Sequence, residues 1–162
     1  MKKKKMPLIL AAAICLLSVI TMITVLANPR KGAVQTFTPP PFEENAVAGV
    51  PTVPEGLGWG ELDAKVYKAS VCGVIRVEDG GADVWFTNPE SNTVWLKLRI
   101  LDRNGNILGE TGIIKPGEYV QRVSFDTLPQ SGDAIVLKLM AYEPETYHSA
   151  GAVTLNTTVS RT

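Results

Sequence analysis

Thr93-Val-Trp-Leu-Lys-Leu-Arg-Ile-Leu101, followed directly by Asp102-Arg-Asn-Gly-Asn106, is the stretch of sequence that determines the fold. In the first run, leucine and isoleucine side chains alternate with Lys97 and Arg99, so a strand here buries one face and exposes the other. The Asn-Gly pair between two apolar runs is the strongest short-range signal for a β-hairpin, because a type I′ turn needs positive φ at both central residues. Residues 107–110 are then the return strand of that hairpin.

Short apolar runs separated by turn residues continue on both sides of this hairpin. Further strands are predicted at residues 71–77, 82–86, 119–125, 134–142 and 153–159, with a bulge near Arg122. No amphipathic helix pattern follows residue 60. About seven short strands in residues 57–162 indicate an all-β domain, an antiparallel immunoglobulin-like or fibronectin III-like β-sandwich. Cys15 and Cys72 do not form the paired cysteines of an immunoglobulin domain.

The apolar run Met6–Ala27 contains no charged residue, and as a helix it covers about 30 Å, the thickness of a bilayer core. Lys2 to Lys5 precede it and only two basic residues, Arg30 and Lys31, follow closely. The positive-inside bias then predicts a single-pass protein of the cell membrane, with residues 1–5 as a cytoplasmic basic tip, 6–27 as a transmembrane signal anchor, and an extracytoplasmic domain.

Signal cleavage is the alternative interpretation of the same run. Val25 and Ala27 fit the −3 and −1 positions of a cleavage site before Asn28, which would release the domain. Acylation of Cys15 is rejected, because Ile14 stands where a small residue is required. Residues 28–56 contain six prolines and are predicted to be an extended Pro-rich linker.

Charge and residue content argue against several classes of function. After Lys31 the chain has sixteen acidic and ten basic residues, which is unfavourable for binding nucleic acid. His148 is the sole histidine and lies in a polar loop without a serine elbow motif, so we expect no enzyme, no cofactor and no metal centre. Cys72 is interpreted as a small buried apolar residue.

Two groups of acidic residues resemble calcium ligands. Asp102–Asn106 begins like a calcium loop, but Ile107 and Ile113 stand where an EF-hand requires glycine and glutamate, and the hairpin turn explains the same residues. A weak calcium site at one end of the sandwich is the other possibility left open by the sequence. Its ligands would be Glu78, Asp79, Asp83 and Glu90.

Aromatic residues provide the signal for binding. Trp85, Trp95, Tyr142 and Tyr147 are the predicted contact residues, with Trp85 and Trp95 in one exposed patch. Exposed coplanar tryptophans would favour a carbohydrate or cell-wall ligand, whereas buried ones would favour a protein partner.

Several segments resemble a group of small membrane-anchored extracellular proteins of Gram-positive gut bacteria. The segments are Val84-Trp-Phe-Thr-Asn-Pro89, the strand 96–100, Ile114-Lys-Pro-Gly-Glu118, and Val136-Leu-Lys-Leu139 with Tyr142. These are turn and core signatures, so the resemblance implies location and fold and no catalytic residue. We therefore expect a non-enzymatic cell-surface protein whose β-sandwich binds other proteins, as in a surface, secretion, pilus or transfer assembly, with carbohydrate binding as the alternative.

Overall fold

The computed structural model describes Ser18, Met22 and residues 37–161. The expected basic tip, membrane anchor and cleavage position at Ala27 and Asn28 lie outside these residues, apart from Ser18 and Met22. Among the described residues, no helix is both long enough and apolar enough to cross a membrane. The compact unit spans Pro39–Thr162.

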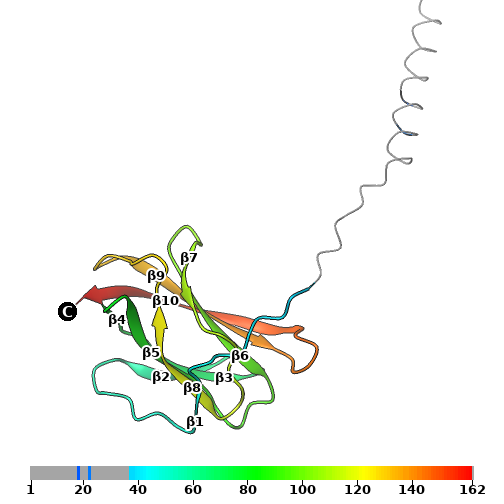
Figure 1. Ribbon diagram of the computed structural model, residues 1–162, viewed down its shortest axis with the longest axis horizontal. Helices are drawn as coiled ribbons and strands as arrows, with labels where there is room; N and C mark the ends of the chain where they lie inside the picture. Colours follow the sequence, from blue (N-terminus) through cyan, green and yellow to red (C-terminus); the bar gives the residue numbers. More distant parts are fainter. Residues whose placement is uncertain (1–17, 19–21, 23–36, 162) are drawn as a thin grey trace, which may run out of the picture. The chain divides into compact units, whose positions relative to one another are not determined.

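Every regular element between residues 37 and 161 is a β-strand, which confirms the prediction of an all-β domain (Figure 1). Ten strands are found in this part of the chain, where about seven were expected. The strands are β1 (Val47–Ala48), β2 (Trp59–Asp63), β3 (Lys68–Cys72), β4 (Ile75–Glu78), β5 (Gly81–Asn88), β6 (Trp95–Leu101), β7 (Ile107–Glu110), β8 (Glu118–Ser124), β9 (Ala134–Tyr142) and β10 (Ser149–Arg161).

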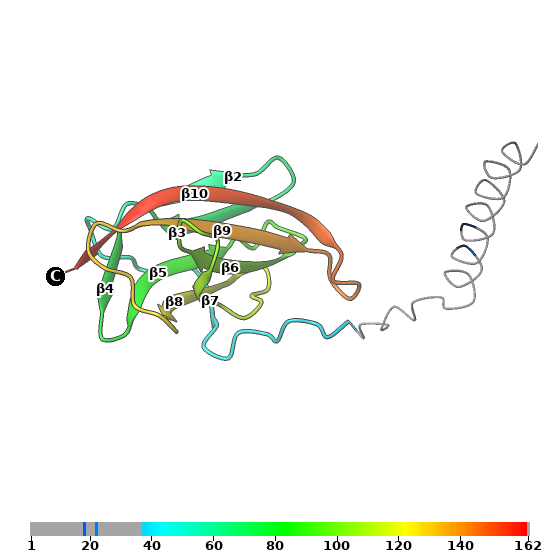
Figure 2. The same ribbon diagram turned by 90° about the horizontal axis from the view of Figure 1, so that it is seen from above.

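The strands form one sheet that curls into two facing layers. Its order is β1-β8-β5-β4-β10-β9-β6-β7, and β3 joins it by pairing with β5 and β2. The long strand β10 belongs to both layers: it pairs antiparallel with β9, and its last residues, Val159 to Arg161, pair parallel with β4 (Figures 1 and 2). This parallel pair corrects the expectation of an entirely antiparallel sandwich, and it arises because β10 crosses from one layer to the other.

The core lies between the two layers. The inward half of the alternation predicted for residues 93–101 is confirmed, because Leu96, Leu98 and Ile100 are fully buried. The outward half is not exposed as expected, because Lys97 is buried and Trp95 and Arg99 are partly buried. Full burial of a leucine or isoleucine side chain contributes about 1.5–3 kcal/mol to the stability of the fold. Strands from both layers supply the largest fully buried side chains, which include Ile75, Val84, Phe86, Leu96, Leu98, Ile100, Ile135, Leu137 and Leu139.

The single strand expected at residues 71–77 is divided into β3 and β4. The N–H groups of Gly73 and Val74 donate to the carbonyl oxygens of Gly58 and Leu57, both at 3.0 Å, rather than to a neighbouring strand. The bulge predicted in the strand 119–125 near Arg122 lies instead on the partner strand: between Asp83 and Phe86, β5 advances three residues while β8 advances two, from Arg122 to Val120.

The hairpin predicted at the Asn-Gly pair is confirmed, but its turn is not of type I′. Only Gly105 has positive φ there (85°), so Asn104 does not adopt the left-handed conformation. The Asp102 carboxylate instead accepts the N–H groups of Asn104 and Asn106, both at 2.8 Å. Strands β6 and β7 pair in the register Arg99 opposite Glu110.

The linker was expected to cover residues 28–56. The structure instead places the chain in the compact unit from Pro39 onward. The N–H of Glu43 donates to Ile113 O at 2.8 Å, and the Glu43 carboxylate accepts the N–H of Gly112 at 2.7 Å. Strand β1 then pairs with β8. An extended segment satisfies its backbone groups at a sheet edge as readily as in water, so proline content alone did not reveal this contact.

Candidate functional site

The candidate site lies on the outward side of the layer that contains β6, β7 and β9. Because inward and outward side chains alternate along a strand, burial of the β6 leucines sends the intervening residues outward. In the strand register, Trp95 stands opposite Tyr142 and Lys97 opposite Met140. The site, called the β6–β9 face below, comprises Trp95, Lys97, Arg99, Glu110, Met140 and Tyr142.

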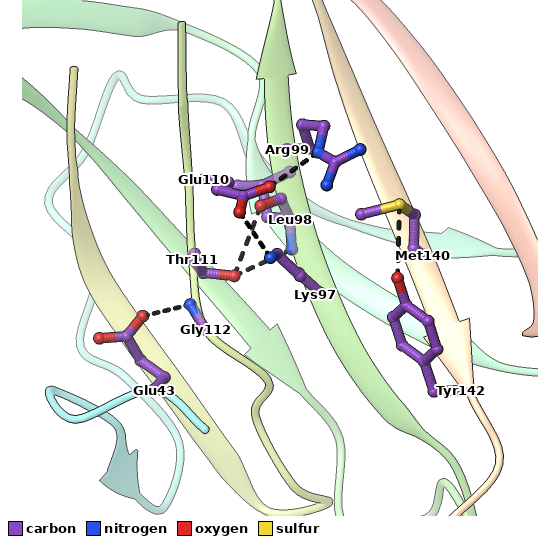
Figure 3. Close-up of polar contacts among 9 residues, drawn as sticks. All are labelled: Glu43, Lys97, Leu98, Arg99, Glu110, Thr111, Gly112, Met140 and Tyr142. Carbon is purple, nitrogen blue, oxygen red and sulfur yellow. Dashed lines mark hydrogen bonds and ion pairs between the residues drawn. The ribbon is translucent and has the colours of Figure 1, made fainter. Parts of the chain in front are cut away.

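Two partly buried ion pairs that share Glu110 occupy the middle of this face (Figure 3). Lys97 Nζ lies 2.7 Å from Glu110 Oε1, and Arg99 Nε lies 2.7 Å from Glu110 Oε2. The Lys97 side chain is only 6% exposed and that of Glu110 is 35% exposed. Burial raises the pKa of the Glu110 carboxyl, but the hydrogen bonds and charges of Lys97 and Arg99 outweigh it and leave this pKa below its usual range.

The segment after β7 forms hydrogen bonds with residues 41–43, which lie beside it. Thr111 continues the ladder, with its N–H donating to Leu98 O at 2.9 Å and its hydroxyl accepting the Leu98 N–H at 3.0 Å. The next residue, Gly112, donates its N–H to the Glu43 carboxylate (Figure 3). Phe42 is therefore held by backbone contacts on both sides, including its bridge to Ile113.

An aromatic group extends the face at the Trp95 end. The Trp95 ring meets Phe42 edge-on, with ring centroids 5.0 Å apart, and meets Tyr147 edge-on at 5.3 Å. The ammonium group of Lys115 lies 4.8 Å from the Phe42 ring centroid. We call Phe42, Trp95 and Tyr147 the aromatic group. Phe42 was missed in the sequence because it lies in the stretch assigned to the linker.

Tyr142 completes this end of the face. It stands beside Trp95 in the β6–β9 ladder, and its hydroxyl donates to the sulfur of Met140 at 3.8 Å (Figure 3). Of the four predicted contact residues, the structure thus brings Trp95, Tyr142 and Tyr147 together.

Trp85 lies elsewhere, and the expected Trp85–Trp95 patch is not formed. Trp85 is 9% exposed and packs with Leu57 and Cys72 on the outward side of the other layer, where its ring stacks on Tyr119 at 6.0 Å. The two tryptophans are separated because β5 and β6 belong to opposite layers. Trp85 has positive φ (45°), and its indole N–H is buried without a hydrogen-bond partner.

Cys72 in the same cluster is fully buried, as the sequence predicted. Burial, with a smaller effect of the Asp83 charge, raises the pKa of the Cys72 thiol to about 12. We expect iodoacetamide at pH 8 to leave Cys72 unmodified in the folded protein and to alkylate it completely in 6 M guanidinium, because the thiolate is the reactive form. Mass spectrometry of the Cys72 peptide measures this, and equal labelling in both conditions would contradict the burial.

The remaining candidates do not converge. His148 is highly exposed and lies 4.0 Å from the Glu143 carboxylate, while the hydroxyl of its neighbour Ser149 accepts the N–H of Gly151. Asp83 interacts with Arg122 and Gln121. A hydrogen bond from the Asn106 side chain lowers the pKa of Asp102 within its own turn. No three metal-ligating side chains gather among the described residues.

No protein-family model and no curated protein matches the sequence. Among solved structures, the chain is similar to CopC from Methylosinus trichosporium OB3b, with 17% identity and a TM-score of 0.36 over 64% of this chain and 94% of that one. It is also similar to a β-glucuronidase from Ruminococcus gnavus, with 16% identity and a TM-score of 0.37 over 56% of this chain and 15% of that one. Neither likeness amounts to a family assignment.

Proposed function

We propose that this protein is a non-enzymatic binding module of the cell surface. In this proposal an immunoglobulin-like sandwich binds a partner protein through the β6–β9 face and the aromatic group. The supporting observation is the position of Trp95, which contacts two aromatic rings edge-on next to the Lys97–Glu110–Arg99 ion pairs. Rigid aromatic anchors beside arginine are the composition that dominates protein interfaces.

A protein ligand fits this face better than a sugar does. A carbohydrate platform presents open, coplanar rings for stacking, whereas Phe42 and Tyr147 meet Trp95 edge-on and Trp85 is buried. Lys115 adds positive charge beside Phe42, and Lys138, which stands opposite Arg99 in the ladder, adds it at the other end of the β6–β9 face. The partner that suits this surface carries an apolar side chain surrounded by acidic residues.

The location of the module is part of the same proposal and rests on sequence alone. The uncharged run Met6–Ala27 behind Lys2 to Lys5 supports a single-pass anchor with the domain outside the cell. Cleavage before Asn28 would give a released form of the same module. The partners that suit an anchored module are the proteins of a surface assembly such as a secretion, pilus or transfer apparatus.

The Trp95→Ala variant tests the proposal. We expect it to reduce partner recovery at least about tenfold, because truncating a central aromatic anchor typically costs 2 kcal/mol or more of binding energy. The measurement is crosslinking of the full chain in intact cells, followed by quantitative mass spectrometry of the captured proteins.

Two controls accompany this variant. Leu128→Ala removes an apolar side chain that is 48% exposed and lies outside the face, so it should leave capture unchanged. Circular dichroism must show that the Trp95 variant is folded. Recovery of cell-wall glycan without protein, lost on Trp95→Ala, would contradict the proposal in favour of carbohydrate binding.

A further inference from the structure

The long segment between β1 and β2 lies over the outward side of the layer that contains β3, β5 and β8 (Figure 1). We call residues 50–57 of this segment the cover. Its Leu57 is buried together with Cys72 and Trp85, and Val53 packs against the same cluster. Cys72 and Trp85 point away from the core between the layers, so they are kept out of water because the cover lies over them.

The cover is attached by side chains and by very little backbone hydrogen bonding. Within the part of the chain that the structure describes, residues 50–56 form no backbone–backbone hydrogen bond, and the Leu57 oxygen accepts the Val74 N–H at 3.0 Å. Gly49 before the cover and Gly58 after it have positive φ, 113° and 59°, a region that glycine enters without strain. A segment attached in this way opens at a lower free-energy cost than the paired strands beneath it.

Trp85, beneath the cover, has two features that are typical of a binding site. Its indole N–H is buried and has no acceptor among the described residues, although a buried tryptophan N–H normally has one. Its φ of 45° is a strained conformation for a residue with a side chain, and such strain is concentrated at ligand sites. The Trp85 carbonyl oxygen, in contrast, accepts both the Trp59 indole N–H at 2.8 Å and the Thr87 hydroxyl at 3.1 Å. The residue is therefore fixed in place while its N–H lacks an acceptor.

We propose that the surface under the cover is a second binding face, which takes an extended, proline-containing peptide of a partner protein in place of the cover. The cover itself contains two prolines at the spacing Pro51-Thr-Val-Pro54, and segments with this spacing bind aromatic surfaces. Trp85, whose ring stacks on Tyr119 at 6.0 Å, provides such a surface. A peptide that places a carbonyl oxygen at the Trp85 N–H makes a hydrogen bond that the cover does not make. The proposal concerns the layer opposite to the β6–β9 face and does not depend on that face.

Labelling of Cys72 measures whether the cover opens by itself. A methanethiosulfonate reacts with a thiolate much faster than iodoacetamide does, so it detects rare openings of the folded chain. Below the unfolding transition, we expect the labelling rate in the full chain in detergent to rise only slightly with urea, because a local opening exposes little surface. Mass spectrometry of the Cys72 peptide gives the rate. A dependence on urea as steep as that of global unfolding would overturn the proposal.

Two matched variants show whether the attachment of the cover controls this rate. Val53→Ser removes a side chain that packs on the Trp85 cluster, and Val50→Ser makes the same change at a side chain that is 84% exposed. We expect Val53→Ser to raise the labelling rate of Cys72 about fivefold, because a partly buried apolar side chain is lost. Val50→Ser should leave the rate unchanged. Equal rates in the two variants would contradict the proposed role of the cover.

Peptide binding provides the second test. The probe is a fluorescein-labelled peptide with the sequence of residues 50–57, and its binding to the full chain in detergent is measured by fluorescence anisotropy. The tethered cover competes with the probe at high effective concentration, so we expect Val53→Ser to bind the probe at least about fivefold more tightly than the wild type does. The same peptide with alanine at both proline positions should bind more weakly. No binding to Val53→Ser, equal binding of the two peptides, or binding that is lost in Trp95→Ala would each refute the second binding face.

Discussion

Glu110→Gln is expected to lower the free energy of unfolding by about 2–4 kcal/mol, because removing one partner of a buried ion pair leaves the other charge uncompensated. Lys97 is the group left behind: its side chain is 6% exposed and its ammonium lies 2.7 Å from Glu110. The lower part of this range applies because a third of the Glu110 side chain reaches solvent. Urea unfolding followed by tryptophan fluorescence measures the difference.

The effect should depend on pH in acid. The pKa of Glu110 is lower in the folded chain than in the unfolded chain, so the folded state releases this proton more readily. Its stabilisation is fully present above the unfolded pKa of about 4.3 and is lost as the pH falls through the folded pKa. The stability difference between the wild type and Glu110→Gln should therefore be constant near neutral pH and should narrow below about pH 4.

Two further variants separate this effect from loss of a surface charge. Glu61→Gln breaks the Lys68–Glu61 pair, whose side chains are about half exposed, and should cost less than about 1 kcal/mol. Lys97→Met removes the buried charge and leaves Glu110 paired with Arg99, so it should change stability by less than about 1.5 kcal/mol. If Glu110→Gln were as mild as Glu61→Gln, Lys97 would not be buried in solution.

The β6–β7 hairpin shows how much of this fold could be predicted from local sequence. The alternation of residues 93–101 determined which side chains enter the core, and the Asn-Gly pair located the turn. The pairing of Lys97 with Glu110 was not predicted, because it depends on which residues face each other across two strands. The prediction of a type I′ turn was wrong, because the Asp102 carboxylate accepts two backbone N–H groups and Asn104 keeps a negative φ.

Trp85 and Phe42 show why the site itself was predicted only in part. The alternation of side chains along β5 correctly directs Trp85 away from the core between the layers. It does not show to which layer a strand belongs, and β5 lies in the layer opposite to β6. Phe42 reaches Trp95 through the contacts of residues 42 and 43 with Ile113 and Gly112, about seventy residues away in the chain. Nothing in a proline-rich composition indicates such a distant contact.

The approach of β7 to β8 leads to the other large expected effect. The N–H of Asp126, just beyond β8, donates to Leu108 O at 2.8 Å, so the end strand β7 meets the chain beside β8 here. Gly109 lies at this junction, and a Cβ atom on it would overlap the carbonyl oxygen of Ser124 and would lie 3.1 Å from a methyl carbon of Val123. The neighbour is backbone, which cannot rotate away as a side chain can.

Gly109→Ala is therefore expected to destabilise the fold by about 3 kcal/mol, at the upper end of the usual cost of overpacking a core. Gly60→Ala in β2 is the matched control, because a Cβ there meets nothing within 4 Å. A strand glycine in open space should gain up to about 1 kcal/mol on becoming alanine, since the unfolded chain then has less conformational freedom to lose. Urea unfolding of both variants measures the contrast. If the two changed stability equally, β7 and β8 would not be in contact, and the sheet would be open on this side.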